Sequence, residues 1–393
     1  MYIKTLKLKN YRNYEEIEVN FDPKINIIYG NNAAGKTNLL ESIYICSTSK
    51  SHKNTKENDI INFDKNESHI KLVFNRGEQP LDMSSTSYKN EIIDIQLNRD
   101  LKKGVAKNGI KVEKLSEFLG FFNVIMFAPE DLNIIKDGPV IRRKFLDIQL
   151  SQIDKIYVNI IQNYNKTLNQ RNALLKDIYK TTGNNRQDLI SILDTYDEQM
   201  ADYGLEVIKK RRENIKELAK KIYNIHLLIS DNKEKLIVDY ENDIIGSSEL
   251  VGTSSNSPKE IYLKKLKETR DTDIKNQYTM IGPHRDDISF KVEDKDIRKF
   301  GSQGQKKTTA ISLKLSELEM LKEKINDTPV LLLDDVFSEL DENRQKLLVK
   351  NLKGIQTIIT CTGIKKNIFD LLKPEKVFNV ADNKVIDKTN LIN

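Results

Sequence analysis

The sequence has no tryptophan and only two cysteines, Cys46 and Cys361, among its 393 residues. Neither cysteine has metal-ligand spacing, so both are expected to be buried, reduced thiols. No apolar run approaches the ~20 residues that span a bilayer, and the first ten residues lack the apolar segment of a secretory signal. The net charge of +6 is small for this length, which permits nucleic-acid binding without requiring it. We therefore expect a cytoplasmic protein without a membrane segment.

Residues 30–37 carry the strongest chemical signal. They read Gly-Asn-Asn-Ala-Ala-Gly-Lys-Thr and fit the phosphate-loop pattern G-x-x-x-x-G-K-[ST]. A short β pattern precedes them and a helical pattern follows, which is the context that a phosphate loop requires. Backbone N–H groups would surround the phosphates, with Lys36 on the β and γ phosphates and the Thr37 hydroxyl on Mg²⁺. The predicted nucleotide contacts are Gly30, Asn31, Asn32, Ala33, Ala34, Gly35, Lys36, Thr37 and Asn38.

A second signal lies near the C-terminus, where the apolar run Val330–Leu333 ends in Asp334 and Asp335. A buried strand that delivers a carboxylate to magnesium has this form, so Asp334 is predicted to bind Mg²⁺ directly or through water. Asp335 could act as a general base or orient water, or it could merely cap the next segment. We predict Lys36 and Asp335 as catalytic residues. Because about 300 residues separate the two signals, the fold must bring both ends of the chain together.

The chain changes character between these signals. Residues 1–29 and about 67–115 read as short strands, and the second group predicts an antiparallel β layer. Apolar residues then recur at steps of three and four from Ile153 to Leu168 and from Leu189 to Val207. This spacing predicts two long amphipathic helices, joined at the turn signal 181–185 into an arm. The pattern indicates an α/β core that is interrupted by a helical insertion.

A third element, residues 300–307, places serine, glycine and glutamine before a helical pattern at 308–321. Serine and glycine at a helix N-terminus can form an anion site, although a plain helix cap has the same appearance. A protein with a complete phosphate loop does not need a second anion site for the same nucleotide. We therefore predict that this element contacts the γ-phosphate of a nucleotide held by another copy.

Six stretches together resemble the ABC-type ATPase heads of the SMC superclass, and more closely the RecF family of bacterial DNA replication and repair proteins. The stretches are 10–14 (NYRNY), 30–37 (GNNAAGKT), 126–132 (MFAPEDL), 282–287 (GPHRDD), 301–305 (GSQGQ) and 333–341 (LDDVFSELD). The resemblance implies an α/β ABC-type ATPase head, with a mixed sheet and an antiparallel β layer, interrupted by an α-helical arm. The predicted domains are 1–140 for the N-terminal part of the head, 141–275 for the arm and 276–393 for the C-terminal part.

The resemblance also implies roles for single residues. Ser302 and Gln305 would act on the nucleotide of a dimer partner. Arg12 would lie near the base or the α-phosphate, unless it is a surface arginine that pairs with Glu15 or Glu16.

The sequence departs from the wider ATPase pattern in three places. Asp335 stands where transporter heads carry glutamate, which agrees with a slow ATPase. The histidine expected after the next strand is missing, so Thr360 or Thr362 would sense the γ-phosphate, and Thr362 is the predicted contact. A clear Q-loop glutamine is also missing, and Glu130 or Asp131 is a weak candidate for its role.

The stretch 282–287 has two interpretations. His284 and the acids that follow could suggest metal binding or general-base chemistry. No second ligand cluster with matching spacing accompanies them, so we favour a supporting role for the nucleotide site or for a DNA-facing surface.

The function that the resemblance implies is ATP-dependent DNA binding in recombinational repair and replication restart. ATP and Mg²⁺ are the implied cofactors. ATP would close a head-to-head homodimer on gapped, single-stranded or duplex DNA, and weak, DNA-stimulated hydrolysis would release it. The implied partner is the mediator protein RecR, with loading of the RecA recombinase as the outcome. The alternatives are the ATP-binding subunit of an ABC transporter, against which the arm and 282–287 argue, and a short SMC-like DNA tether, for which the arm is too short.

Overall fold

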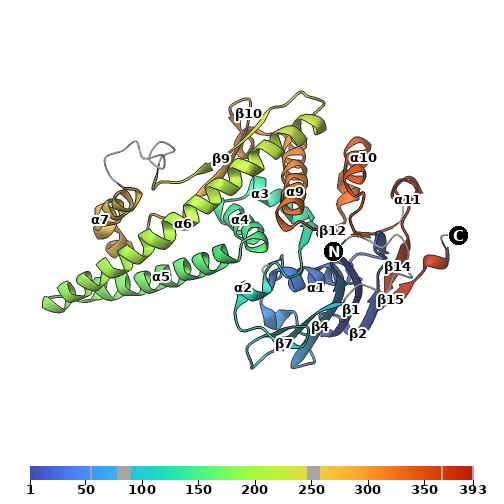
Figure 1. The fold of residues 1–393 in the computed structure, drawn as a ribbon, viewed down its shortest axis with the longest axis horizontal. Coiled ribbons are helices and arrows are strands. Elements are labelled where there is room, and N and C mark those ends of the chain that lie inside the picture. Colours follow the sequence, from blue (N-terminus) through green and yellow to red (C-terminus); the bar gives the residue numbers. More distant parts are fainter. Residues whose placement is uncertain (54, 78–89, 246–256, 364–365, 392–393) are drawn as a thin grey trace. The chain divides into compact units, whose positions relative to one another are not determined.

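The computed structural model describes residues 1–53, 55–77, 90–245, 257–363 and 366–391 (Figure 1). Contacts divide the chain into two compact units. Unit 1 contains Met1–Leu132 and Ala310–Asn393, and unit 2 contains Asn133–Thr309. The divisions predicted from the sequence fall after residues 140 and 275, whereas residues 276–309 make their contacts within unit 2.

Unit 1 contains a six-stranded mixed sheet in the order β15-β14-β3-β13-β12-β8. All neighbours are parallel except the edge pair β14 and β15. The apolar run Val330–Leu333 of the inner strand β12 is fully buried, as expected for a parallel strand that is covered on both faces. The strands are β3 (Ile25–Tyr29), β8 (Val124–Phe127), β12 (Val330–Asp334), β13 (Thr357–Cys361), β14 (Lys376–Ala381) and β15 (Lys384–Asp387).

A second, antiparallel sheet of unit 1 has the order β2-β1-β4-β5-β6-β7. Its alternating pattern buries Leu6 and Leu8 of β1 and exposes Lys7 and Lys9. The predicted antiparallel layer in 67–115 is therefore confirmed. The strands are β1 (Tyr2–Tyr11), β2 (Tyr14–Asn20), β4 (Glu67–Asn75), β5 (Glu91–Asn98), β6 (Gly104–Lys107) and β7 (Ile110–Lys111).

Helix α1 (Lys36–Thr48) contacts strands of both sheets, namely β4 of the antiparallel sheet and β8, β12 and β13 of the mixed sheet. This double contact explains why nearly every residue of the helix is buried. The N-terminus of α1 follows directly after the loop that leaves β3. The other helices of unit 1 are η1 (Glu57–Asp59), α2 (Leu115–Phe118), η2 (Pro129–Asp131), η4 (Val336–Glu339), α10 (Glu342–Asn351), α11 (Lys366–Leu372) and η5 (Thr389–Leu391).

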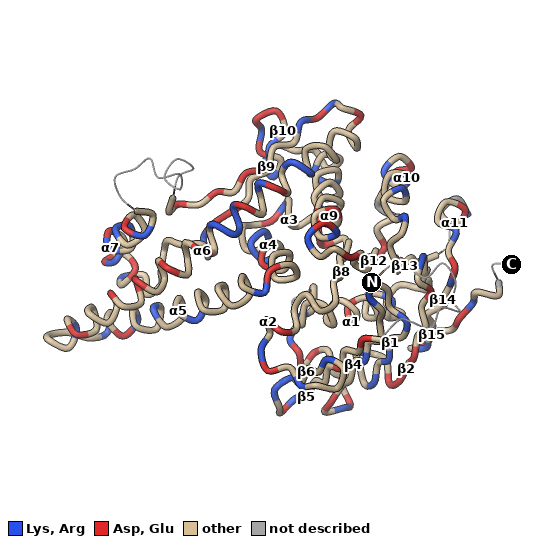
Figure 2. Tube along the Cα trace, viewed as in Figure 1, with Lys and Arg blue, Asp and Glu red and all other residues tan. Residues whose placement is uncertain are grey.

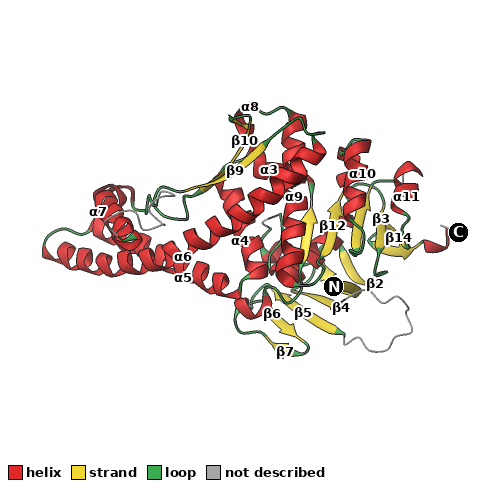
Figure 3. Cartoon of the chain, turned by 45° about the horizontal axis from the view of Figure 1, so that its top comes forward, coloured by secondary structure: helices red, strands yellow, loops and turns green. Residues whose placement is uncertain are grey.

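Unit 2 is built on two long helices, α5 (Lys155–Lys180) and α6 (Asn184–Ile229), which pack along each other (Figures 1 and 3). They confirm the helical arm predicted from the apolar spacing. A small antiparallel sheet has the order β11-β10-β9. The remaining elements are α3 (Leu132–Lys136), α4 (Pro139–Ile153), β9 (Leu236–Glu241), α7 (Pro258–Asn276), β10 (Asp287–Val292), β11 (Lys295–Asp296) and α8 (Ile297–Phe300). The unit boundary falls within α9 (Gln303–Ile325).

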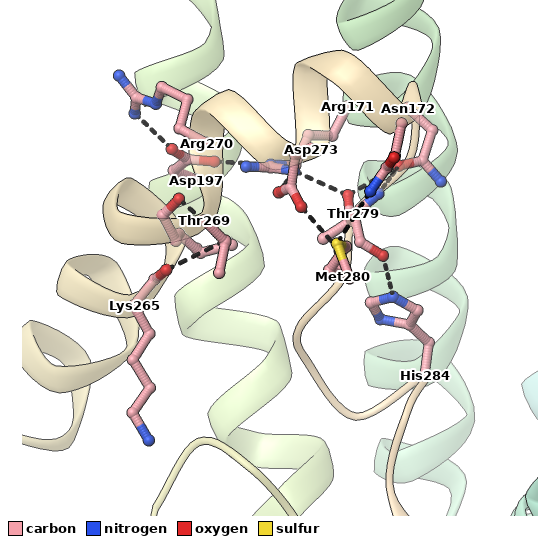
Figure 4. A network of polar contacts seen from close by, with 12 residues as sticks. Arg171, Asn172, Asp197, Lys265, Thr269, Arg270, Asp273, Thr279, Met280 and His284 are labelled. Carbon is pink, nitrogen blue, oxygen red and sulfur yellow. Dashed lines mark hydrogen bonds and ion pairs between the residues drawn. The ribbon is translucent and has the colours of Figure 1, made fainter.

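A buried network of charges joins helices α5, α6 and α7 of unit 2 (Figure 4). Arg171 of α5 is fully buried and donates to Asp197 of α6 at 2.7 Å and to Asp273 of α7 at 2.8 Å. Arg270 of α7 donates to the second oxygen of Asp197 at 2.6 Å. Arg171 also donates to Thr279 at 2.8 Å, which holds the segment after α7 against α5. These bonds explain why residues beyond 275 belong to unit 2.

Among the residues that the structure describes, no helix is both long enough and apolar enough to cross a membrane.

Candidate phosphate-binding site

The loop between β3 and α1 depends on its two outer glycines. A Cβ atom on Gly30 would lie 2.3 Å from the carbonyl oxygen of Val380 in β14. Gly35 has a φ of 109°, and a Cβ atom there would lie 2.7 Å from both the Asn13 amide nitrogen and the Tyr14 hydroxyl. Only glycine fits such close approaches, so the spacing of the pattern is a packing requirement of this loop.

Lys36 is the first residue of α1 and bends back over the loop. Its Nζ donates to the carbonyl oxygens of Gly30 and Asn31, both at 2.8 Å. Burial lowers the pKa of Lys36, and the nearby carboxylates of Asp335 and Asp334 oppose this shift. The ammonium therefore lies at the centre of the loop, where it faces backbone oxygens.

Asp334, at the end of β12, meets the start of α1. Its Oδ1 accepts a hydrogen bond from Thr37 Oγ1 at 3.0 Å and another from Thr360 Oγ1 at 2.6 Å. Thr360 is its register partner on the neighbouring strand β13. The fold thus brings together residues that are 297 positions apart, as the two sequence signals required.

Asp335 leaves the strand in a left-handed conformation with a φ of 51°. Its backbone N–H donates to the Thr360 hydroxyl at 3.1 Å, which fixes the turn. Its side chain makes no capping hydrogen bond to η4, so the interpretation of Asp335 as a helix cap is wrong. The buried Oδ1 atom of Asp335 has no hydrogen-bond partner among the described residues. This carboxylate is available to a ligand or to water.

These residues line one cavity of about 270 Å³. It brings together two lysines, two aspartates, two threonine hydroxyls and the loop. The lining residues are Asn32, Ala33, Gly35, Lys36, Thr37, Asn38, Lys53, Asp334, Asp335 and Thr362.

The chemistry of this lining fits a magnesium nucleotide. Hydroxyl and carboxylate oxygens are the ligands that Mg²⁺ prefers, and Mg²⁺ usually keeps several waters besides one or two protein carboxylates. No cluster of three or more His, Cys, Asp or Glu side chains that could hold a metal occurs in the described parts of the chain. A site completed by Thr37, Asp334 and a phosphate group does not need such a cluster.

Two lining residues illustrate what the sequence could and could not decide. Of the two candidates for the γ-phosphate sensor, Thr362 lines the cavity, whereas Thr360 is buried behind it and bonds Asp334. Lys53 was missed by the sequence analysis. It belongs to no motif, and only the path of the chain after α1 places it at the cavity.

Asn13, in the turn between β1 and β2, braces the loop. Its Oδ1 accepts from the amide of Asn38 at 2.7 Å, and its Nδ2 donates to Asn383 at 2.6 Å and more weakly to the carbonyl oxygen of Ala34 at 3.4 Å. The predicted contacts Asn31 and Ala34 therefore present their carbonyl oxygens to Lys36 and Asn13.

Arg12 is held by a buried acid rather than by its sequence neighbours. Its Nε and Nη2 donate to the two oxygens of Glu41 in α1, at 2.9 and 2.8 Å. The alternative pairing with Glu15 or Glu16 is therefore wrong. Burial tends to raise the pKa of Glu41, but the hydrogen bonds from Arg12 and Ser51 outweigh it and lower the pKa. A contact of Arg12 with the base or the α-phosphate stays a prediction.

The two weak candidates for the Q-loop differ in their surroundings. Asp131 accepts from the backbone N–H of Ala128 at 2.8 Å and lies 4.0 Å from Lys314. Burial raises the pKa of Asp131 to about 6, in spite of Lys314. Glu130 is exposed. The lining of the cavity, as far as the structure describes it, includes neither residue.

Ser302 and Gln305 belong to unit 2 and form a reciprocal cap on α9. Ser302 Oγ accepts from the backbone N–H of Gln305 at 3.1 Å, and Gln305 Oε1 accepts from the backbone N–H of Ser302 at 2.9 Å. Gln305 Nε2 also donates to Glu234 at 3.0 Å. Within a single chain, Ser302 and Gln305 therefore act as a helix cap. Their action on the nucleotide of a second copy stays a prediction.

The stretch 282–287 supports the helices of unit 2. His284 Nε2 donates to the carbonyl oxygen of Thr279 at 3.0 Å, and Nδ1 accepts from the Tyr164 hydroxyl at 2.7 Å. Burial lowers the pKa of His284 to about 4, so the ring is neutral at pH 7. Asp287 accepts two hydrogen bonds from Arg142, at 2.5 and 2.9 Å. These partners account for both side chains without a metal or a base role.

The RecF/RecN/SMC N-terminal domain family matches residues 2–386 of the chain. A solved Smc head domain from Pyrococcus furiosus, with an extended coiled coil and bound to the C-terminal domain of ScpA, superposes with a TM-score of 0.53 at 16% identity. It covers 100% of this chain and 97% of that chain. The fold is therefore that of an ABC-type ATPase head of the SMC class.

Proteins of higher sequence identity to this chain identify its family within this class. The DNA replication and repair protein RecF of Agathobacter rectalis is 46% identical over 98% of this chain and 99% of its own. That of Lachnospira eligens is 45% identical over 99% of this chain and 100% of its own. A solved structure of the recombination mediator protein RecF with ATP in the RecFOR pathway superposes with a TM-score of 0.88 at 35% identity, covering 98% and 97% of the two chains. The chain belongs to the RecF family.

Proposed function

We propose that this protein is an ATP-dependent DNA-binding protein of recombinational repair and replication restart. The observation that carries the proposal is the single cavity at which Lys36, Thr37, Asp334 and Asp335 meet. The family relationship supports the same function, because relatives of nearly equal length are DNA replication and repair proteins. A RecF structure with ATP supports ATP as the nucleotide.

In this proposal the loop N–H groups and the Lys36 ammonium receive the phosphates. Lys36 donates to two loop carbonyls in the structure, and phosphate oxygens would take over these bonds when nucleotide binds. Thr37 and Asp334 would hold Mg²⁺, which supplies positive charge beside the β and γ phosphates. Asp335 would accept a hydrogen bond from the attacking water, since its Oδ1 has no partner among the described residues. Lys36 and Asp335 are thus the proposed catalytic residues.

The remaining parts of the proposal concern assembly. Ser302 and Gln305 would complete the nucleotide site of a second copy, so that ATP closes a homodimer and slow, DNA-stimulated hydrolysis opens it. The dimer would act in the cytoplasm at gapped, single-stranded and duplex DNA, with RecR as its partner in loading RecA. A related RecF described within the RecFOR pathway supports this assignment.

The DNA contacts would be made mainly to phosphates. Lysines and arginines gather in the C-terminal half of α6, from Lys209 to Lys221, and recur on α9 and α10 (Figure 2). Such contacts position a protein without reading sequence, and the affinity falls steeply with salt.

The nucleotide site is tested by Lys36→Met. This change should abolish binding of MgATP in an equilibrium titration, because it removes the buried cation of the loop. Lys9→Met, an exposed position on β1, serves as the control and should bind normally. Wild-type affinity in Lys36→Met would contradict the assignment of the site.

The role of unit 2 is tested by Ser302→Arg. The variant should still bind MgATP, because its own phosphate loop is unchanged, but it should not form an ATP-dependent dimer in sedimentation velocity. An ATP-induced dimer of this variant would refute the action of Ser302 on a second copy.

A further inference from the structure

Both ends of the Gln305 amide already have partners within the chain. Its Oε1 accepts from the backbone N–H of Ser302 at 2.9 Å, and its Nε2 donates to Glu234 Oε1 at 3.0 Å. The first bond belongs to the cap of α9. The second bond leaves the helix and reaches a carboxylate that lies 71 positions earlier in the chain. None of the stretches that the sequence analysis singled out contains Glu234.

Glu234 is itself fixed by its neighbours. It lies in the turn between the end of α6 and the start of β9 (Figure 1). Its backbone N–H donates to Ser230 Oγ at 3.3 Å, and its Oε2 lies 3.2 Å from Nε2 of His226. The His226 side chain is fully buried, whereas that of Glu234 is 25% exposed. Because an ionised carboxylate only accepts hydrogen bonds, the His226 ring donates to it and sets its direction.

The small sheet of unit 2 connects Glu234 to the start of α9. β9 follows Glu234 and pairs with β10, β10 pairs with β11, and α8 leads from β11 to Ser302. The N–H of Gly301 donates to the carbonyl oxygen of Ile297 at 3.0 Å, and a Cβ atom on Gly301 would lie 2.6 Å from the same oxygen. The contact between Glu234 and Gln305 therefore joins two ends of one hydrogen-bonded frame.

The groups that this contact engages are those that a phosphate would need. An ionised phosphate oxygen accepts hydrogen bonds, so Ser302 and Gln305 can bind it only through their N–H and O–H groups. Two of these donors, the Ser302 N–H and the Gln305 amide, are used inside the chain. The Glu234 carboxylate is an anion beside the first turn of α9, where the helix dipole favours negative charge. It takes the donor that a phosphate would take, and it repels an approaching phosphate.

We propose that Glu234 restrains Gln305 and opposes closure of the dimer until the γ-phosphate of a second copy's ATP displaces it. The proposal rests on the proposed function, in which Ser302 and Gln305 act on that nucleotide. Glu234 is a positioning residue, because it acts through Gln305 and does not touch the nucleotide. ADP has no γ-phosphate and leaves the contact intact, so the contact favours the open state unless ATP is bound.

Glu234→Ala tests the restraint in the dimer. Loss of one partly exposed hydrogen bond to a carboxylate changes an equilibrium about five-fold, and a symmetric dimer breaks two such bonds. The dissociation constant of the dimer in saturating MgATP should therefore fall about twenty-five-fold in sedimentation experiments. Damage to the fold would weaken the dimer instead. An unchanged or higher dissociation constant would overturn the proposal.

Two further variants complete this test. Glu241→Ala removes an exposed glutamate at the far end of β9 and should dimerise as the wild type does. Glu234→Gln keeps the size of the side chain and serves if Glu234→Ala does not fold. It can still accept from Gln305, but a neutral bond is about half as strong as a charge-assisted one, so its dissociation constant should fall by about five-fold. An unchanged constant in Glu234→Gln would also overturn the proposal.

A measurement on the monomer without nucleotide tests the contact itself. In Glu234→Ala the Gln305 side chain loses its outer partner, so the Ser302 N–H that it covers should exchange with solvent several-fold faster than in the wild type. Amide hydrogen exchange by NMR measures this rate, with Glu241→Ala as the control. Equal rates in Glu234→Ala and the wild type would show that Glu234 does not hold Gln305.

The two levels of the proposal fail in different ways. If the wild type forms no dimer with MgATP, the proposed function fails and this inference falls with it. If the wild type dimerises, Ser302→Arg does not, and Glu234→Ala dimerises no more tightly than the wild type, only the role of Glu234 is refuted.

Discussion

The substitution Asp335→Asn separates catalysis from folding at this site. It keeps the size of the side chain and removes the charge. Asparagine tolerates the left-handed conformation that Asp335 adopts at a φ of 51°. The backbone N–H that bonds Thr360 is unchanged. We therefore expect the variant to fold like the wild type.

The expected magnitudes differ sharply for stability and for turnover. The side chain makes no capping hydrogen bond, and its Oδ1 has no partner among the described residues, so its change should alter the free energy of unfolding by less than about 0.5 kcal/mol. A positioned general base contributes about 10²–10⁴-fold to a rate. ATP turnover should fall by at least about a hundred-fold, which corresponds to about 2.7 kcal/mol of activation free energy.

The assay is single-turnover hydrolysis of MgATP, with the affinity measured separately by equilibrium titration. Asp382→Asn is the matched control, because Asp382 has a φ of 49° in the exposed turn between β14 and β15, away from the cavity lining. It should leave turnover unchanged. Turnover within two-fold of the wild type in Asp335→Asn would refute the role of Asp335 as the base.

Three further changes test the structure around the sites. Arg171→Met leaves Asp273 buried without its charged partner and leaves Asp197 paired with Arg270 alone, and it should lower the free energy of unfolding by about 3–5 kcal/mol in urea; a loss under about 1 kcal/mol would contradict the network's importance. Thr360→Val removes the hydroxyl that bonds the Asp334 carboxylate and should cost about 1.5–3 kcal/mol by the same measurement, and an unchanged value would mean that this bond adds nothing. Burial lowers the pKa of His284 from 6.5 to about 4, so the unfolded chain binds a proton that the folded protein does not. The stabilisation is present above pH 6.5 and is lost as the pH falls toward 4, by about 2 kcal/mol at pH 5. His284→Asn should therefore lose about that much less than the wild type between pH 7 and pH 5, and parallel losses would contradict the shift.

The phosphate loop, the strand β3 before it and the strand β12 that ends in Asp334 could be predicted, because each depends on residues that are adjacent in the sequence. Close backbone approach requires glycine at positions 30 and 35, and burial requires the apolar run that ends in Asp334. Both requirements act on residues that are adjacent in the sequence, so the sequence shows them. The arm could be predicted for the same reason, because an amphipathic helix repeats its pattern along its whole length.

The surroundings of the site could not be predicted, because they depend on contacts between distant segments. Arg12 has acids three and four positions away in sequence, yet it bonds Glu41, which the fold brings next to it from α1. Lys53 lies in an unremarkable basic stretch, and only the path of the chain after α1 brings it to the cavity. The helix cap formed by Ser302 and Gln305 could be anticipated as one alternative. The sequence alone does not show which hydrogen-bond partner a polar side chain has.

The central claim is that ATP closes a dimer of this protein on DNA. Sedimentation velocity of the full chain with Mg²⁺ and ATP, with and without a gapped duplex, and with ADP as the comparison, tests it most directly. The account predicts an ATP-specific shift from monomer to dimer that the gapped duplex strengthens. A monomer under every condition would contradict it, because Ser302 and Gln305 would then have no second nucleotide to act upon.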